Sequence, residues 1–135
     1  MSNNKDLIKN TNKGLHFLSL GGIGEIGGNC YLYGCDGKWI MIDLGLSFAD
    51  EKYPGIDLLV PKIDFAVSLG DNLEAIIISH GHEDHAGAIS FFADKIQCPV
   101  YVSRFPKLLI ENRLKEFGKL EKLKLLEIDF NKNIS

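Results

Sequence analysis

The feature that most constrains this chain is a short apolar run that leads directly into a cluster of histidines. Residues 75–78 (AIII) are rich in isoleucine and bounded by polar residues, which is typical of a buried strand. From residue 86 onwards the apolar side chains change to helical spacing. The intervening sequence HGHEDH, residues 80–85, is therefore predicted to lie beyond the carboxyl end of a strand, where open α/β sheets bind their ligands.

The side chains of this cluster have the chemistry of metal ligands. His80 and His82 are two residues apart in an extended segment, so they are expected to point to the same side. Asp84 and His85 begin the predicted helix and can reach a neighbouring point, which predicts two adjacent metal half-sites. Imidazole and carboxylate ligands suit zinc. They also accept manganese and other divalent ions more readily than cysteine ligands would.

Two other interpretations of the cluster fit less well. A solvated loop or a capping histidine would explain one histidine, but not three histidines and a carboxylate within six positions. An HExxH metalloprotease helix could begin at His82, but its second ligand position is occupied by Ala86, and His85 comes one residue too early.

The composition is that of an ordinary globular protein with one domain at most. The chain has 135 residues, of which 45% are apolar and 24% charged. Its net charge of -3 neither supports nor excludes nucleic-acid binding. Three cysteines without metal-type spacing, and no signal peptide or membrane-length apolar segment, predict a cytoplasmic location without a membrane partner. Residues 1–13 are polar and predict a flexible N-terminal arm, with the folded domain at residues 14–135.

A glycine-rich stretch near the N-terminus resembles a dinucleotide-binding fingerprint only superficially. It contains the pattern GxGxxG, and Asp43 lies near the distance expected of a ribose-binding acid. Such a fingerprint must open a helix, so that pyrophosphate meets the free amides of the helix N-terminus. Here the chain continues instead into a β-hairpin with an Asp36-Gly37 turn, which argues against dinucleotide binding.

Asp43 follows the second strand of this hairpin and is expected to lie level with the histidine loop. A carboxylate there could orient the histidines from behind, although a helix cap or turn aspartate is the alternative. The other elements are predicted from periodicity and breakers. Strands are expected at residues 15–20, 30–34, 39–42, 75–79, 98–102 and 123–130, helices at 63–67 and 105–117, and an irregular loop over much of 46–67.

Three separated motifs, in order, carry a resemblance to a known family. The cluster at residues 80–85 resembles the HxHxDH signature of the metallo-β-lactamase superfamily. Together with LGGIGEIGGNCYLY and WIMIDLGLSFADEKYPGIDLLVP, it resembles the start of the ribonuclease J family in the β-CASP branch, over roughly residues 15–130. This resemblance implies an αββα fold and a cytoplasmic two-zinc enzyme that processes and degrades RNA, as an exonuclease from the 5′ end and as an endonuclease.

The resemblance also implies a role for each motif residue. His80 and His82 would hold one zinc, Asp84 and His85 the second, and a bridging water would be the nucleophile. Asp84 could also accept a proton from that water, and Asp43 would support the histidines. The substrate-side loop would comprise Gly22, Gly24, Glu25, Gly27 and Asn29.

The chain also departs from this family. A complete site needs a further histidine on the next strand, a bridging aspartate and a last histidine after an inserted β-CASP domain, yet no histidine follows His85. We therefore expect an incomplete αββα domain, an N-terminal fragment or split-gene product that is inactive alone and whose complete enzyme binds RNA rather than DNA. A non-catalytic metal-binding or interaction module is the alternative, as is a glyoxalase-II-like thioesterase, against which the glycine stretch argues.

Overall fold

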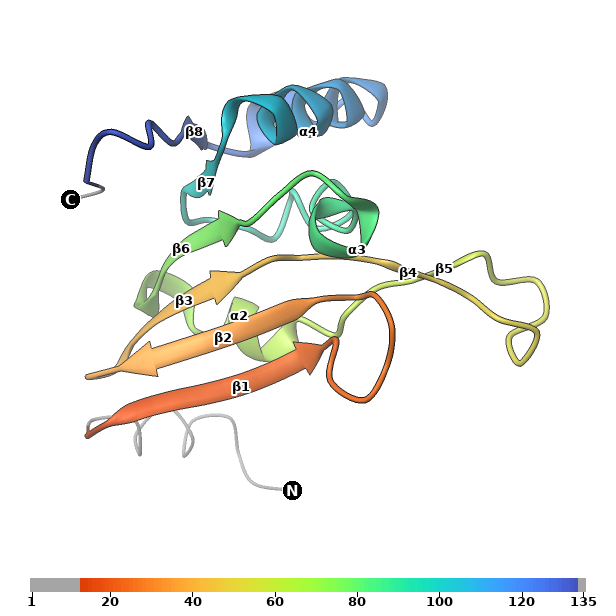
Figure 1. Ribbon diagram of the computed structural model, residues 1–135, viewed down its shortest axis with the longest axis horizontal. Helices are drawn as coiled ribbons and strands as arrows, with labels where there is room; N and C mark the ends of the chain where they lie inside the picture. Colours follow the sequence, from red (N-terminus) through yellow and green to blue (C-terminus); the bar gives the residue numbers. More distant parts are fainter. Residues whose placement is uncertain (1–12, 134–135) are drawn as a thin grey trace.

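The computed structural model describes residues 13–133, which form a mixed six-stranded sheet in the order β1-β2-β3-β6-β7-β8 (Figure 1). Strands β1, β2 and β3 pair antiparallel, whereas β3, β6, β7 and β8 pair parallel. The strands of this sheet are β1 (Leu15–Gly21), β2 (Cys30–Cys35), β3 (Lys38–Ile42), β6 (Leu73–Ile78), β7 (Val100–Val102) and β8 (Leu125–Glu127). The predicted α/β class is confirmed, and all but Lys13 of the predicted N-terminal arm lies outside the described residues.

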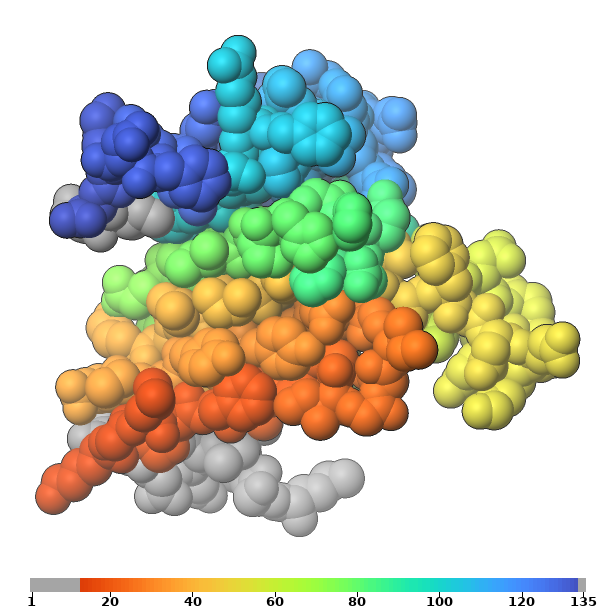
Figure 2. Space-filling view, in the orientation of Figure 1, coloured from red at the N-terminus to blue at the C-terminus, as the bar shows by residue number. Residues whose placement is uncertain are grey.

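Short helices and one small ribbon connect these strands. The connections contain the ribbon β4 (Ser47–Phe48) and β5 (Leu58–Leu59), the helices α2 (Asp64–Ser68), α3 (Glu83–Ala86) and α4 (Arg104–Glu116), and the 3-10 turns η1 (Gly70–Asn72) and η2 (Leu120–Lys122). Figure 2 shows the β4–β5 segment, in yellow, projecting beyond the rest of the described chain. Among the described residues no helix could cross a membrane, and the longest, α4, has 13 residues.

The hairpin of β2 and β3 forms as its turn sequence predicts. Cys35 pairs with Lys38, and the two residues between them, Asp36 and Gly37, have φ angles of 50° and 80°. Two positive φ angles define the type I′ turn, whose twist matches that of the flanking strands. The glycine-rich stretch lies before this hairpin, joins the antiparallel strands β1 and β2, and opens no helix, as predicted.

Among residues 13–133, only one face of the sheet is closely packed. The fully buried strand residues Leu32, Met41, Ile76, Val100 and Val102 form the core together with apolar side chains from the connecting helices and turns. The alternate residues point to the other face and are only partly buried or exposed. This second face is formed by Tyr31, Tyr33, Ile40, Ile42, Ile77 and Tyr101.

Two predicted elements are shorter than expected. The helix after the histidine cluster is only four residues long, and residues 87–95 form successive turns. The carbonyl oxygens of Asp84 and His85 accept hydrogen bonds from the amides of Asn29 and Leu44, 3.0 and 2.8 Å away, so they do not bond amides four residues on. The strand expected at 123–130 is limited to β8, because its partner β7 offers only three residues before α4 begins.

Gly45 allows the close approach on which α3 depends. A Cβ atom at this position would collide with the Asp84 carbonyl group. Leu46, next in the chain, donates its amide to the Glu83 carbonyl oxygen over 2.9 Å. The loop after β3 and the first turn of α3 are therefore in direct backbone contact.

Replacing Gly45 with alanine should lower the free energy of unfolding by about 1–3 kcal/mol, the usual cost of overpacking a rigid backbone contact. It should also speed hydrogen exchange of the Asn29 and Leu44 amides, which donate to α3. Gly55→Ala is the control, because Gly55 has a φ of 78° but open space around it. That variant should lose about 1 kcal/mol through backbone strain and leave both amides protected. Unchanged exchange in Gly45→Ala would contradict the close-contact explanation.

Candidate metal centre

The candidate site lies where β3 and β6 end at the same edge of the sheet. These strands are parallel neighbours, with Ile42 beside Ile77, so the residues that follow each strand emerge together. Asp43 follows β3, and Ser79 and the histidine cluster follow β6. The fold thus places Asp43 against His85, which lies 42 positions later in the sequence.

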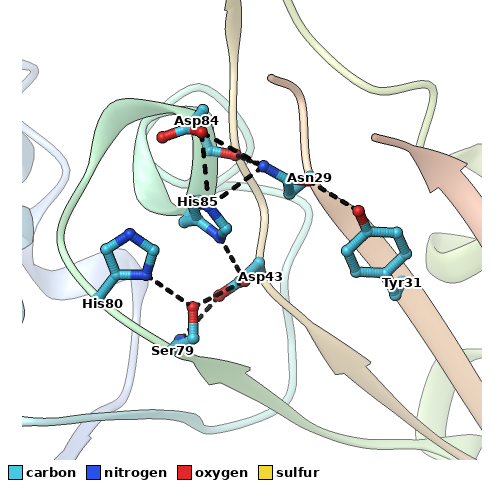
Figure 3. A network of polar contacts seen from close by, with 7 residues as sticks. All are labelled: Asn29, Tyr31, Asp43, Ser79, His80, Asp84 and His85. Carbon is cyan, nitrogen blue, oxygen red and sulfur yellow. Dashed lines mark hydrogen bonds and ion pairs between the residues drawn. The ribbon is translucent and has the colours of Figure 1, made fainter. Parts of the chain in front are cut away.

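Asp43 is buried and has an uncommon backbone conformation. Asp43 is 3% exposed, and its φ of 62° lies in the left-handed region that non-glycine residues seldom adopt. Its Oδ1 atom accepts a hydrogen bond from the Ser79 amide at 2.7 Å. Its Oδ2 atom accepts from the Ser79 hydroxyl at 2.8 Å and from His85 Nδ1 at 2.7 Å (Figure 3).

These contacts fix which nitrogen of two histidines carries the proton. His85 Nδ1–H donates to Asp43, so His85 Nε2 keeps its lone pair. The single hydroxyl proton of Ser79 also goes to Asp43, so the Ser79 oxygen accepts from His80 Nδ1, 3.0 Å away. In the neutral form of each imidazole the proton is therefore on Nδ1, and Nε2 has the lone pair that can bind a metal ion.

The three imidazoles form one group. The ring centroid of His80 lies 4.6 Å from that of His82 and 4.1 Å from that of His85. His85 Nε2 is 3.4 Å from Asp84 Oδ2, whereas the side chain of His82 is exposed. The two pairs assigned from the sequence are thus adjacent, with His80 between His82 and His85.

The donor chemistry of this group suits a divalent metal ion, but its geometry is not that of a closed site. Three imidazoles and a carboxylate are ligands that zinc accepts, and the Nδ1 contacts of His80 and His85 leave Nε2 of each ring as the atom that can coordinate a metal. In residues 13–133, however, no three donor groups from histidine, cysteine, aspartate or glutamate are placed to hold one ion together. The residues therefore have the chemistry of metal ligands, but they form an incomplete set.

Cys30 lies behind Asp43 and does not add a thiolate to the donor set. Burial raises the pKa of its thiol to about 12, and the nearby charge of Asp43 contributes to the increase. At neutral pH the thiol is therefore protonated, whereas a metal would require the thiolate. Cys30, Cys35 and Cys98 are all free thiols, and the cytoplasmic location stays a prediction.

The predicted substrate-side loop divides into an exposed tip and a base that contacts the site. Ile26 at the tip is 97% exposed, and Glu25 Oε1 accepts from the Gly22 amide at 3.1 Å. At the base, Asn29 Nδ2 lies 3.5 Å from Asp84 Oδ2 and 3.3 Å from His85 Nε2. Asn29 is thus placed against the candidate metal ligands themselves. Gly24 lies with the exposed tip, and Gly27 is buried at the base against Ser47.

Sequence reasoning did not find Ser79 or Tyr31. Ser79 connects Asp43 to His80, and its place directly before the cluster was the only available signal. The Tyr31 hydroxyl donates to Asn29 Oδ1 over 2.7 Å, but a tyrosine in a strand has no distinguishing pattern.

The sheet, and the histidine and aspartate cluster at its edge, define the class: the chain belongs to the metallo-beta-lactamase superfamily, whose family model matches residues 23–130. The expected metallo-β-lactamase fold is confirmed. Membership of this superfamily implies metal ions.

Within that class, the chain is similar to Ribonuclease J 2, which confirms the resemblance found in the sequence motifs. It is 38% identical over 109 residues to the protein from Staphylococcus aureus (strain NCTC 8325 / PS 47) and 36% identical over 109 residues to that from Staphylococcus epidermidis (strain ATCC 12228 / FDA PCI 1200). Each match covers 81% of this chain but 20% of the relative, so the chain spans about a fifth of the length of these relatives.

One solved structure, described by the words "Indirect contributions of mutations underlie optimization of new enzyme function", matches 87% of this chain and 59% of its own length. The TM-score is 0.49 and the sequence identity is 21%, a likeness too low to support an argument.

Replacing Asp43 with asparagine should change the tautomer of His85. One face of the new side chain can still accept from the Ser79 amide, but the NH2 group that replaces Oδ2 cannot accept from His85 Nδ1. Nitrogen-15 NMR of the imidazoles should show Nδ1–H at His85 in the wild type and mainly Nε2–H in Asp43→Asn. The internal control is His16 on β1, whose Nε2 atom lies 3.0 Å from the Lys13 carbonyl oxygen. An unchanged His85 spectrum would exclude this role of Asp43.

Proposed function

We propose that this chain carries the first metal ligands of an RNA-cleaving hydrolase of the ribonuclease J type. The observation that carries the proposal is the Asp43-centred cluster, in which His80 and His85 both present an unprotonated Nε2 atom beside Asp84. The similarity to Ribonuclease J 2 extends over 109 residues and supports RNA as the substrate.

We assign the ligand roles residue by residue. His80 and His82 would hold one zinc ion, and Asp84 and His85 would hold a second. Bound zinc supplies an activated water and stabilises negative charge on the scissile phosphate. The Asp84 side chain is 45% exposed, so it can meet the substrate side and accept a proton from the attacking water. Asp43 holds the two imidazoles in their metal-binding tautomer.

The ligand set in this chain is insufficient for turnover. Each proposed ion has two protein ligands here, whereas catalytic zinc sites have three and two-metal hydrolysis needs both ions held about 3.5–4 Å apart. Further donors would have to come from another segment of a longer protein or from a second chain. A non-catalytic metal-binding module is the second candidate, and it is favoured by the lack of three converging donor groups among residues 13–133.

We expect the chain to bind zinc, but weakly for a zinc protein. Complete structural sites reach apparent binding energies of about 10–16 kcal/mol, and two ligands per ion should give much less. Titration calorimetry should show zinc binding that is reduced in a His80→Ala, His82→Ala double variant, which removes one of the two proposed half-sites, and weakened about 10- to 100-fold by Asp43→Ala. His16→Ala, which removes the fourth histidine, on β1, is the matched control. Nanomolar binding of two ions, or unchanged binding in the double variant, would contradict the assignment.

The 135-residue chain should be inert on 5′-monophosphorylated RNA. It lacks a complete two-metal ligand set, and its net charge of -3 offers no excess of cations for phosphate contacts. Co-expression with the C-terminal remainder of a ribonuclease J should restore zinc-dependent cleavage, which His82→Ala should abolish and His16→Ala should not. Robust zinc-dependent cleavage by the chain alone would show that the donors counted as missing are supplied in another way.

A further inference from the structure

The side-chain amide of Asn29 lies at the point where two proposed metal ligands face each other. Its Nδ2 atom is 3.3 Å from His85 Nε2 and 3.5 Å from Asp84 Oδ2, and these two donor atoms are 3.4 Å apart. The three atoms therefore form a nearly equilateral triangle. Figure 3 shows the amide reaching α3 from the strand side of the site.

A metal ion at His85 would need the lone pair that Asn29 now uses. Because His85 Nδ1 donates its proton to Asp43, Nε2 has one lone pair and acts as an acceptor. The only hydrogen-bond partner of Nε2 in the described structure is the Asn29 amide. An N–H group carries partial positive charge, so it takes the place of a cation between the imidazole and the Asp84 carboxylate. The amide and a metal ion cannot occupy this position together.

Other contacts hold the Asn29 side chain in place, and its main chain is fixed separately. Tyr31 donates its hydroxyl to Asn29 Oδ1 over 2.7 Å, and Nδ2 donates to the Asp84 carbonyl oxygen at 3.0 Å. The main chain of Asn29 is fixed independently, since its amide donates to the same carbonyl oxygen and its own carbonyl accepts from Gly45. Rotation of the side chain would therefore free the ligands while the backbone stays in position.

We propose that Asn29 competes with the metal ion for the Asp84 and His85 position, and that Tyr31 holds Asn29 in the competing conformation. This inference rests on the proposed metal site. Loading of that position requires the Asn29 side chain to rotate away, breaking its hydrogen bond to His85. Asn29 therefore lowers the metal affinity of the chain and keeps the two ligands correctly spaced while no metal is bound.

Zinc titration of the full chain, by calorimetry or against a fluorescent chelator, tests the inference. Asn29→Ala should bind zinc roughly 2- to 10-fold more tightly, the equivalent of about one net hydrogen bond. Tyr31→Phe keeps the ring and removes only the hydroxyl, so it should shift affinity in the same direction by a smaller factor. Asn72→Ala, an asparagine in η1 before β6, is the matched control and should not change affinity.

A structural readout accompanies the titration. In the wild type, the side-chain NH2 resonances of Asn29 should shift strongly as zinc is added, whereas those of Asn72 should not. Circular dichroism and backbone NMR spectra establish that each variant is folded, and Tyr31→Phe provides the test if Asn29→Ala does not fold.

Weaker or unchanged zinc binding in the folded Asn29 and Tyr31 variants, beside measurable binding by the wild type, would overturn the inference and leave the metal site in place. Weaker binding in particular would make Asn29 a residue that positions Asp84 for the metal. If the folded wild type and both variants bind no zinc at all, the metal site fails and the inference fails with it.

Discussion

The buried carboxylate of Asp43 is the interaction on which the arrangement of the site depends. It joins the end of β3 to the loop after β6 by accepting hydrogen bonds from the Ser79 amide, the Ser79 hydroxyl and His85. A left-handed backbone at a non-glycine residue costs of order 1–3 kcal/mol, and burying a polar group without partners would cost more. Three short hydrogen bonds offset both costs, and the same bonds set the imidazole tautomers.

Helix α3 is held by its neighbours more than by its own length. Four residues form one turn, which has little stability alone. Its carbonyl oxygens accept from the loop after β3 and from Asn29, and on the other side Glu83 pairs with Arg113 of α4 through two hydrogen bonds of 2.5 Å. The Glu83 carboxylate raises the pKa of the Arg113 guanidinium, so Arg113 stays charged across the physiological range. Asp84 and His85 are therefore presented from a rigid turn fixed on both sides.

Local pattern was sufficient for most of the fold and placed the candidate metal ligands at one edge of the sheet. The hairpin was predictable because Asp36-Gly37 is a turn sequence, and β6 because its isoleucine run has strand character. The helix after the cluster was predicted too long, since the carbonyl groups that should extend it bond instead to residues 29 and 44. The contacts of Asn29 with α3 were not predictable in the same way, because 55 positions separate it from Asp84 and nothing in its local sequence indicates the pairing.

These sequence separations have a consequence for folding kinetics. The contacts that complete the site join residues 36, 42 and 55 positions apart. The entropy of closing such loops must be lost before the contacts stabilise anything, and parallel strand pairing of this kind is slow. We therefore expect the hairpin of β2 and β3 to form early, and the candidate metal ligands to come together only when β6 has docked beside β3. During synthesis the candidate metal ligands can reach their final arrangement only after the ribosome has released the chain well beyond His85.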